Sequence, residues 1–307
     1  MKIYLKLLLT AIFWGGTFVA GRFVAQNVGP YSIAFLRFTI ASILLLLLTW
    51  RIEGRLPRPK KSQIIPVILL GMTGIFIYNV MFFKGLKIIE AGRASLIVAT
   101  CPIFITICSA IFLKEKINAV KSIGIIISVC GAMIVISKGN IYQIFECGLG
   151  LGELYIFCCV LSWVAYSLIG KVVMKNLSPL VSVSYSSTVG AIALSFPAFF
   201  EGLPRNISSQ SMPDWLCISY LGVFGTVIGF VWYYQGVERI GPTKAGLFIN
   251  FVPISAILCA FLILREPITT SLAAGTALVI SGVYLTNRTA KVKAAQSPAS
   301  NTSQNLG

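Results

Sequence analysis

GRASLIVATCPIFITICSAIFLKEKI, residues 92–117, is followed 151 positions later by TKAGLFINFVPISAILCAFLILREPI, residues 243–268, and the two align without a gap. In this alignment Pro102 of the first stretch meets Pro253 of the second. The same shift aligns residues 70–136 with residues 221–287. The sequence therefore predicts a duplicated unit, built around an apolar helix that carries a proline.

Composition points to a membrane protein. Of 307 residues, 57% are hydrophobic and 11% are charged, and the mean hydropathy is +0.88. A soluble domain of this size needs more charged side chains on its surface, whereas a membrane-spanning helix needs only about 20 apolar residues. The net charge of +16 comes from lysines and arginines between the apolar runs, as in membrane proteins, and not from a basic face. We therefore expect an integral membrane protein that binds no nucleic acid.

The apolar runs predict an all-α protein with ten transmembrane helices in two sets of five. The first repeat covers residues 1–138 and the second 149–288, with a linker at 139–148. Residues 289–307 are polar, which predicts a disordered cytoplasmic tail. The expected helices span residues 4–25, 31–50, 64–86, 93–113, 118–137, 150–171, 179–200, 213–235, 244–264 and 269–287.

Lysine and arginine are distributed unequally over the connecting segments. With the N-terminus inside, 17 of the 25 lie in cytoplasmic segments, seven lie outside, and Arg37 lies within the second helix. The positive-inside rule therefore favours cytoplasmic N- and C-termini. Because five helices per repeat is an odd number, the two repeats cross the membrane in opposite directions. Inverted repeats are typical of secondary transporters, whose substrate site lies near the midplane between the repeats.

Other classes of membrane protein fit less well. The chain has no histidine and a single aspartate, Asp214, so it lacks the residues that commonly build catalytic and metal sites. We expect no enzymatic activity, no metal and no cofactor. An integral membrane enzyme and a non-transporting scaffold are the alternatives. Most of the eight cysteines lie in apolar runs, which favours free thiols over disulfides.

Short motifs in both halves resemble the EamA-like branch of the drug/metabolite transporter superfamily. The resemblance covers residues 5–287 and implies export or uptake of small metabolites, amino acids among them, across the inner cell membrane. Ser186 stands opposite Arg37, so a role of this arginine would not be duplicated. The matching motifs are Phe13-Trp14-Gly15-Gly16-Thr17-Phe18, Leu36-Arg37-Phe38, Leu113-Lys114-Glu115-Lys116, Ser162-Trp163 and Leu264-Arg265-Glu266, with Pro102, Pro253, Gly124, Gly131, Gly275 and Gly282.

The two aligned prolines lie within apolar helices, Pro102 near the middle of its own. Each lacks an N–H and displaces the carbonyl four residues earlier, that of Val98 or Ile249. Exposed carbonyls at mid-depth are tolerated where they line a cavity or find a neighbouring donor. Because both repeats keep the proline in register, we favour a substrate-facing kink over a kink that is filled by packing.

Arg37 lies about six residues into the second expected helix. A charge within the membrane is costly unless it pairs or faces water. Two interpretations remain open: Arg37 faces a cavity and binds a substrate carboxylate or phosphate, or its side chain extends to the lipid headgroups.

Aromatic and amide side chains are expected at middle depths. An aromatic wall with a few polar groups suits a small amphipathic ligand. Trp232 and Tyr233 also fit an aromatic belt at the membrane surface. The candidate substrate-binding residues are Trp14, Arg37, Tyr78, Asn79, Pro102, Trp163, Tyr166, Asn250 and Pro253.

Glu115 and Glu266 end the two proline-containing helices on opposite membrane faces. We expect each carboxylate to cap the start of the following helix and to pair with a nearby lysine or arginine; a gate or proton carrier is the alternative. Glu153 is the one candidate for proton coupling near a helix end. Proton antiport, exchange and facilitated diffusion all remain open.

Small residues in the last helix of each repeat, in Gly124-x-x-x-Ser128 and Ser271-x-x-x-Gly275, allow close helix contact. Packing within one chain is the simpler interpretation, and a homodimer is the alternative. We expect a monomer whose partners are a small-molecule substrate and membrane lipids. The sequence thus predicts an inner-membrane transporter of small metabolites that works outward by alternating access.

Overall fold

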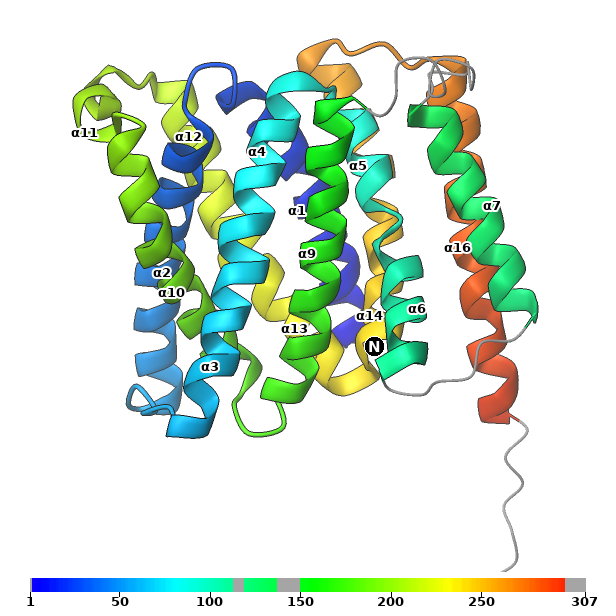
Figure 1. Ribbon diagram of the computed structural model, residues 1–307, viewed down its shortest axis with the longest axis horizontal. Coiled ribbons are helices and arrows are strands. Elements are labelled where there is room, and N and C mark those ends of the chain that lie inside the picture. Colours follow the sequence, from blue (N-terminus) through cyan, green and yellow to red (C-terminus); the bar gives the residue numbers. More distant parts are fainter. Residues whose placement is uncertain (1, 113–118, 137–149, 296–307) are drawn as a thin grey trace, which may run out of the picture.

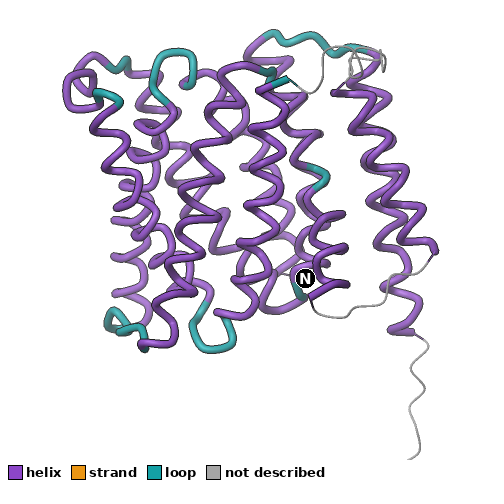
Figure 2. The backbone as a smooth tube through the Cα atoms, in the orientation of Figure 1, coloured by secondary structure: helices purple, strands orange, loops and turns teal. Residues whose placement is uncertain are grey.

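The computed structural model describes residues 2–112, 119–136 and 150–295, and every regular element in these ranges is helical (Figures 1 and 2). Glu115, the expected linker at 139–148 and the tail from residue 296 lie outside the described residues. In the first half the helices are α1 (Lys2–Val24), α2 (Pro30–Glu53), α3 (Lys61–Leu70), η1 (Gly71–Ile77), α4 (Tyr78–Ile88), α5 (Ala91–Val98), α6 (Cys101–Phe112) and α7 (Ala119–Ile136).

The second half repeats this order with a few additional short elements. Its helices are α9 (Leu151–Val173), α10 (Pro179–Phe200), α11 (Leu203–Asn206), η2 (Ile207–Ser209), α12 (Met212–Tyr220), η3 (Leu221–Ile228), α13 (Gly229–Ile240), α14 (Pro242–Gly246), η4 (Leu247–Phe251), α15 (Val252–Cys259), η5 (Ala260–Leu264) and α16 (Thr270–Ala295).

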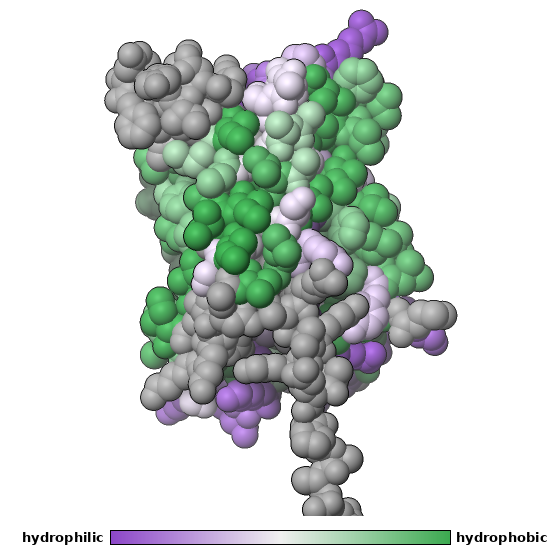
Figure 3. Space-filling view, turned by 90° about the vertical axis from the view of Figure 1, so that its right-hand side faces the viewer, coloured by the Kyte–Doolittle hydropathy of each residue, from purple (hydrophilic) through white to green (hydrophobic). Residues whose placement is uncertain are grey.

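Eight continuous helical segments of the described chain are long and apolar enough to cross a membrane, and α7 and α16 carry shorter apolar stretches. On the face formed by α7 and α16, apolar side chains fill a middle band between hydrophilic ends (Figure 3). Membrane helices must satisfy their backbone polar groups internally, and this all-helical architecture does so. The protein is therefore a multi-pass membrane protein.

The helices stand side by side from one end of the bundle to the other (Figure 1). Helix α2 packs along α10 on one side and α7 along α16 on the other, while α1 and α9 lie between these pairs. A side chain at Gly131 would place its Cβ 2.8 Å from the backbone nitrogen of Val279, so α7 and α16 approach closely. The start of α1 and the end of α16 lie at the same end of the bundle.

Both aligned prolines follow a disturbed turn. The helix expected at 93–113 is interrupted after Val98, where the N–H of Thr100 bonds back only three residues to the carbonyl of Ile97 at 3.1 Å. In the second half the 3₁₀ turn η4 precedes Pro253, and Val252 N–H donates to the carbonyl of Ile249. The missing proline N–H explains why the α-helical bonding is disturbed within one residue of the same place in both halves.

Two of the three π-helical segments in the described residues, η1 and η3, occupy positions related by the 151-residue shift, and the third is η5. In η3 the hydroxyl of Thr226 donates to the carbonyl of Leu221, five residues back, at 3.2 Å. Such segments are rare and often occur at functional sites. Segments η1 and η3 connect the lower and upper parts of the long helices 61–88 and 212–240.

Helix α16 continues to Ala295, beyond the expected end at 287. Residues 283–295 contain neither glycine nor proline, so no residue stops the helix where the composition becomes polar. The segment 289–295, for which disorder is expected from the sequence, is thus helical.

Candidate functional site

A small cavity of about 30 Å³ lies between the two halves, at the centre of the bundle. This volume holds water but no metabolite. Both halves contribute to its wall, through α1, α2, α4, α5, α9, α13, η4 and α15. The lining residues are Trp14, Thr17, Phe18, Arg37, Tyr78, Phe82, Val98, Trp163, Phe230, Ile249 and Val252.

Arg37 supplies the one charged side chain of this lining. It is 3% exposed, so it does not extend to the lipid headgroups. Its Nε donates to the hydroxyl of Thr226 at 2.9 Å and its Nη1 to Oδ1 of Asn79 at 2.8 Å. No carboxylate among the described residues pairs with it. A buried cation whose partners are neutral is well suited to bind an anionic group.

The partners of Arg37 lie in or next to η1 and η3. Asn79 is the second residue of α4, just after η1, and its Nδ2 donates to the carbonyls of Ile75 at 2.8 Å and Gly74 at 3.3 Å. These donations satisfy two backbone oxygens of η1 and leave Oδ1 to accept from Arg37. Thr226 lies within η3. The guanidinium is therefore positioned by one residue from each half, each in or beside a π segment.

Aromatic rings form most of the remaining wall. The rings of Trp14 and Trp163 meet edge to face with centroids 5.2 Å apart, and Tyr78 and Phe230 approach Trp163 at 5.4 and 5.3 Å. Nε1 of Trp14 donates to the carbonyl of Gly225 at 2.9 Å. Nε1 of Trp163 is buried and has no partner with hydrogen-bond geometry among the described residues. This part of the wall is thus mostly apolar, and it contains one indole N–H, that of Trp163, without a hydrogen-bond acceptor among the described residues.

The structure brings four of the nine candidate residues to the cavity: Trp14, Arg37, Tyr78 and Trp163. Asn79 lies directly behind Arg37 as its hydrogen-bond partner. Tyr166 is fully buried behind Trp163, and its ring stacks on that of Tyr234 at 4.9 Å. These two residues support the wall.

Asn250, Pro102 and Pro253 do not line the cavity. The Oδ1 of Asn250 is buried without a hydrogen-bond partner among the described residues. Val98 and Ile249, which stand four residues before the prolines, do line the cavity. The prolines therefore affect the wall through the carbonyls of these two residues, which lack an α-helical donor. Tyr233 is 1% exposed and its ring lies 5.3 Å from that of Trp14, so it belongs to the interior and not to an aromatic belt.

Sequence reasoning missed several wall residues, among them Thr17, Phe82, Phe230 and the positioning residue Thr226. One signal for Phe230 was present: it aligns with Asn79 under the 151-residue shift. Apolar residues such as Phe82 and Val252 carry no signal of their own in a chain that is mostly apolar.

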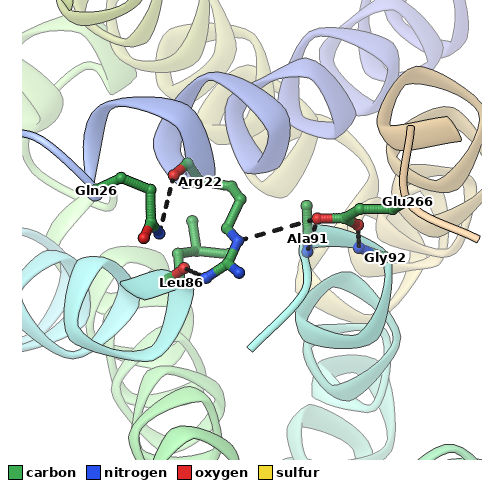
Figure 4. Close-up of polar contacts among 6 residues, drawn as sticks. All are labelled: Arg22, Gln26, Leu86, Ala91, Gly92 and Glu266. Carbon is green, nitrogen blue, oxygen red and sulfur yellow. Dashed lines mark hydrogen bonds and ion pairs between the residues drawn. The ribbon is translucent and has the colours of Figure 1, made fainter. Parts of the chain in front are cut away.

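Glu266 caps a helix of the other half (Figure 4). It follows Arg265, which has a left-handed backbone (φ 56°). Its carboxylate oxygens accept from the backbone nitrogens of Ala91 at 3.1 Å and Gly92 at 3.4 Å, at the start of α5, and Nε of Arg22 lies 4.0 Å away.

We expected Glu266 to cap the following helix, and this was wrong. Thr269 takes that role, since its hydroxyl accepts from the backbone nitrogen of Leu272 at 3.2 Å. The left-handed residue ends the helix and turns Glu266 toward the uncapped N–H groups of α5, where a carboxylate is favourable. The expected arginine contact is present, with Arg22.

Glu153 forms a buried ion pair with Arg93 of α5, at 2.8 Å between Oε1 and Nη2. It lies at the start of α9 and does not line the cavity. The described residues contain no cluster of three or more metal-ligating side chains, and their cysteines are free thiols.

The family model that matches this chain is that of the EamA-like transporter family, and it matches twice, over residues 1–137 and 150–288. An uncharacterized transporter of Archaeoglobus fulgidus is 32% identical, over 94% of this chain and 99% of its own length. The uncharacterized transporter YyaM of Bacillus subtilis is 31% identical, over 92% of each chain.

A more distant relative has a more specific name. The probable terminal-alkyne amino-acid exporter of Streptantibioticus cattleyicolor is 26% identical, over 94% of each chain. A solved crystal structure with 20% identity superposes with a TM-score of 0.66, covering 95% of this chain and 99% of the other. At that identity the superposition shows a shared fold.

Proposed function

The chain belongs to the EamA-like transporter family and is a membrane transporter, and on this premise we propose that it exports small metabolites, amino acids or related compounds, across the inner cell membrane. The observation that carries the proposal is the central cavity, in which the unpaired cation Arg37 stands in an aromatic wall. The amino-acid class is supported by the name of the exporter of Streptantibioticus cattleyicolor.

In this proposal Arg37 binds the carboxylate of the substrate. Two of its five N–H groups are engaged by Thr226 and Asn79, which leaves donors for a further acceptor. The rings of Trp14, Trp163, Tyr78 and Phe230 take the apolar part of the molecule. The indole N–H of Trp163 is a second donor within the same wall.

We further propose ten membrane helices in a 5+5 inverted repeat, with both termini in the cytoplasm. Three observations support this arrangement: the family model matches twice, α7 packs against its counterpart α16, and the start of α1 and the end of α16 lie at one end of the bundle. The 17 to seven distribution of basic residues gives the orientation.

Transport would proceed by alternating access in a monomer. The cavity of about 30 Å³ is too small for an amino acid, so the helices around it must separate for substrate to enter. The disturbed turns before Pro102 and Pro253 and the segments η1 and η3 are the places where these helices can bend. A non-transporting scaffold would have no need of a buried arginine in a cavity.

Uptake into proteoliposomes that contain the purified protein tests the proposal. We expect saturable flux of an apolar amino acid from a pooled mixture of amino acids and metabolites, measured with and without a pH gradient. Absence of flux for every pooled solute, from protein shown to be folded, would contradict the transporter mechanism and favour the scaffold. Opposite imposed gradients report the preferred direction.

A further inference from the structure

The central cavity is lined by one residue from each half that stands four positions before a proline. These residues are Val98 and Ile249. In a continuous α-helix their carbonyl oxygens would accept from the N–H groups of residues 102 and 253, but both of these are prolines and have no N–H. We propose that these two carbonyls bind the ammonium group of the substrate, so that the site recognises both ends of an apolar α-amino acid. This inference rests on the proposed function.

In the first half, Val98 is the last residue of α5, and α6 begins at Cys101. The N–H that would bond to the carbonyl of Val98 in a continuous helix belongs to residue 102, and proline has none. The nearby turn is closed by other carbonyls, since Ala99 N–H donates to Ser95 at 3.0 Å and Thr100 N–H to Ile97 at 3.1 Å.

In the second half, Ile249 lies in the 3₁₀ turn η4 and Pro253 again removes the helical donor. The carbonyl of Ile249 accepts one hydrogen bond, from Val252 N–H three residues on. A carbonyl oxygen has two lone pairs, so one remains for a ligand.

The two carbonyls and Arg37 give the cavity a polarity that a single arginine lacks. No acidic side chain is among the residues that line it, so an ammonium group there would depend on these oxygens and on the faces of the aromatic rings. Backbone carbonyls at interrupted membrane helices coordinate the coupling cations of other secondary transporters, and an ammonium group makes the same demand for oxygen acceptors. A zwitterion fits this wall because its carboxylate meets Arg37 and its ammonium meets the carbonyls, while the side chain contacts Trp14 and Trp163.

The test is a comparison of ligands that differ only in their charged ends. Equilibrium binding to the purified full-length protein is measured for L-phenylalanine and L-leucine, for 3-phenylpropanoate and 4-methylpentanoate, which lack the amino group, and for 2-phenylethylamine and 3-methylbutylamine, which lack the carboxylate. We expect at least one of the two amino acids to bind about tenfold more tightly than both of its analogues, since a hydrogen bond to a charged group is worth about tenfold or more.

Substitution of the prolines then addresses the carbonyls. Pro102→Ala with Pro253→Ala restores an N–H at each position and allows it to occupy the carbonyl four residues earlier. We expect the Kd of the amino acid to rise at least about tenfold, while the Kd of its deaminated analogue stays within about twofold. Pro66→Ala, a proline inside α3 away from the cavity, is the matched control and should change neither value.

Three results would overturn the proposal: neither amino acid binds, each deaminated analogue binds the native protein as well as its amino acid, or the proline variants weaken both equally. The comparison of each amino acid with its deaminated analogue uses the native protein alone. It therefore tests the ammonium site even if the proline variants do not fold. If proteoliposomes transport another solute while neither amino acid binds, the transporter proposal stands and the ammonium site falls. If the amino acids bind with the expected pattern without flux, the ammonium site stands and the transport mechanism falls.

Discussion

Nη1 of Arg37 donates to Oδ1 of Asn79 at 2.8 Å, and Asn79 in turn donates to the π-helical carbonyls of Gly74 and Ile75. The guanidinium is therefore fixed by the same residue that closes the irregular turn of its neighbouring helix. In the proposed mechanism a movement of η1 would shift Asn79 and with it the charge in the cavity, and this would link helix bending to substrate binding.

Arg37→Gln should reduce saturable flux by at least about tenfold, because a charge-assisted hydrogen bond to the substrate is lost. Arg37→Lys keeps the charge without the planar fork and should retain an intermediate rate. Initial rates in proteoliposomes, at matched protein content and with a monodisperse elution profile, give the comparison. Equal rates for native protein and Arg37→Gln would exclude a carboxylate site at this residue.

Trp14→Ala should raise the KM for an apolar substrate by removing part of the aromatic wall. Trp14→Phe keeps a ring but loses the donation from Nε1 to the carbonyl of Gly225 at 2.9 Å, so it should raise the KM less. Aromatic contacts are worth about 0.5–1.5 kcal/mol beyond burial, which corresponds to a change of about two- to tenfold. If both variants keep the native KM, Trp14 does not contact the substrate.

Glu266→Gln should lower the stability of the protein in detergent by about 1 kcal/mol, the usual cost of losing a charged helix cap. Glu90→Gln is the matched control, because Glu90 is the residue before α5 but its side chain makes no capping bond. Thermal unfolding followed by circular dichroism should show a lower midpoint for the first variant alone. Because the glutamine oxygen can still accept from a backbone N–H, equal midpoints would mean that the negative charge of Glu266 contributes nothing to the cap.

Glu153→Gln removes the carboxylate from the ion pair with Arg93, whose side chain is 14% exposed. Breaking a fully buried pair costs about 3–5 kcal/mol, so we expect the unfolding midpoint to fall by less than that cost implies but still measurably. The double substitution Arg93→Gln with Glu153→Gln should recover part of that loss. A double variant less stable than Glu153→Gln would show that the pair itself is not the source of the effect.

The repeat and the apolar runs were sufficient to predict an all-helical membrane protein, and the boundaries of α10, Pro179–Phe200, follow those expected from the sequence. The break between α5 and α6 follows from Pro102. The π segments η1 and η3 left no such signal, because a π turn depends on how neighbouring helices pack and not on one residue type.

For the site, the charged and large aromatic residues could be predicted because they are costly or rare at mid-depth. Arg37, Trp14, Tyr78 and Trp163 line the cavity, and their binding of substrate stays a prediction. The prediction for Glu266 was wrong because the helix that it caps lies in the other half of the chain. Local sequence cannot show which helix start faces a given side chain. The contact of Thr226 with Arg37 could not be predicted, because a single threonine among apolar residues is ordinarily a packing residue.

The two halves contribute different residues to the site and cannot replace each other there. Arg37 of the first half aligns with Ser186, and Thr226 of the second aligns with Ile75, so each half supplies something that the other lacks. Two copies of the first half would bring two arginines to one cavity and no counterpart of Thr226, and two copies of the second would bring no counterpart of Arg37. A chain that contained only one of these halves would therefore specify an incomplete site.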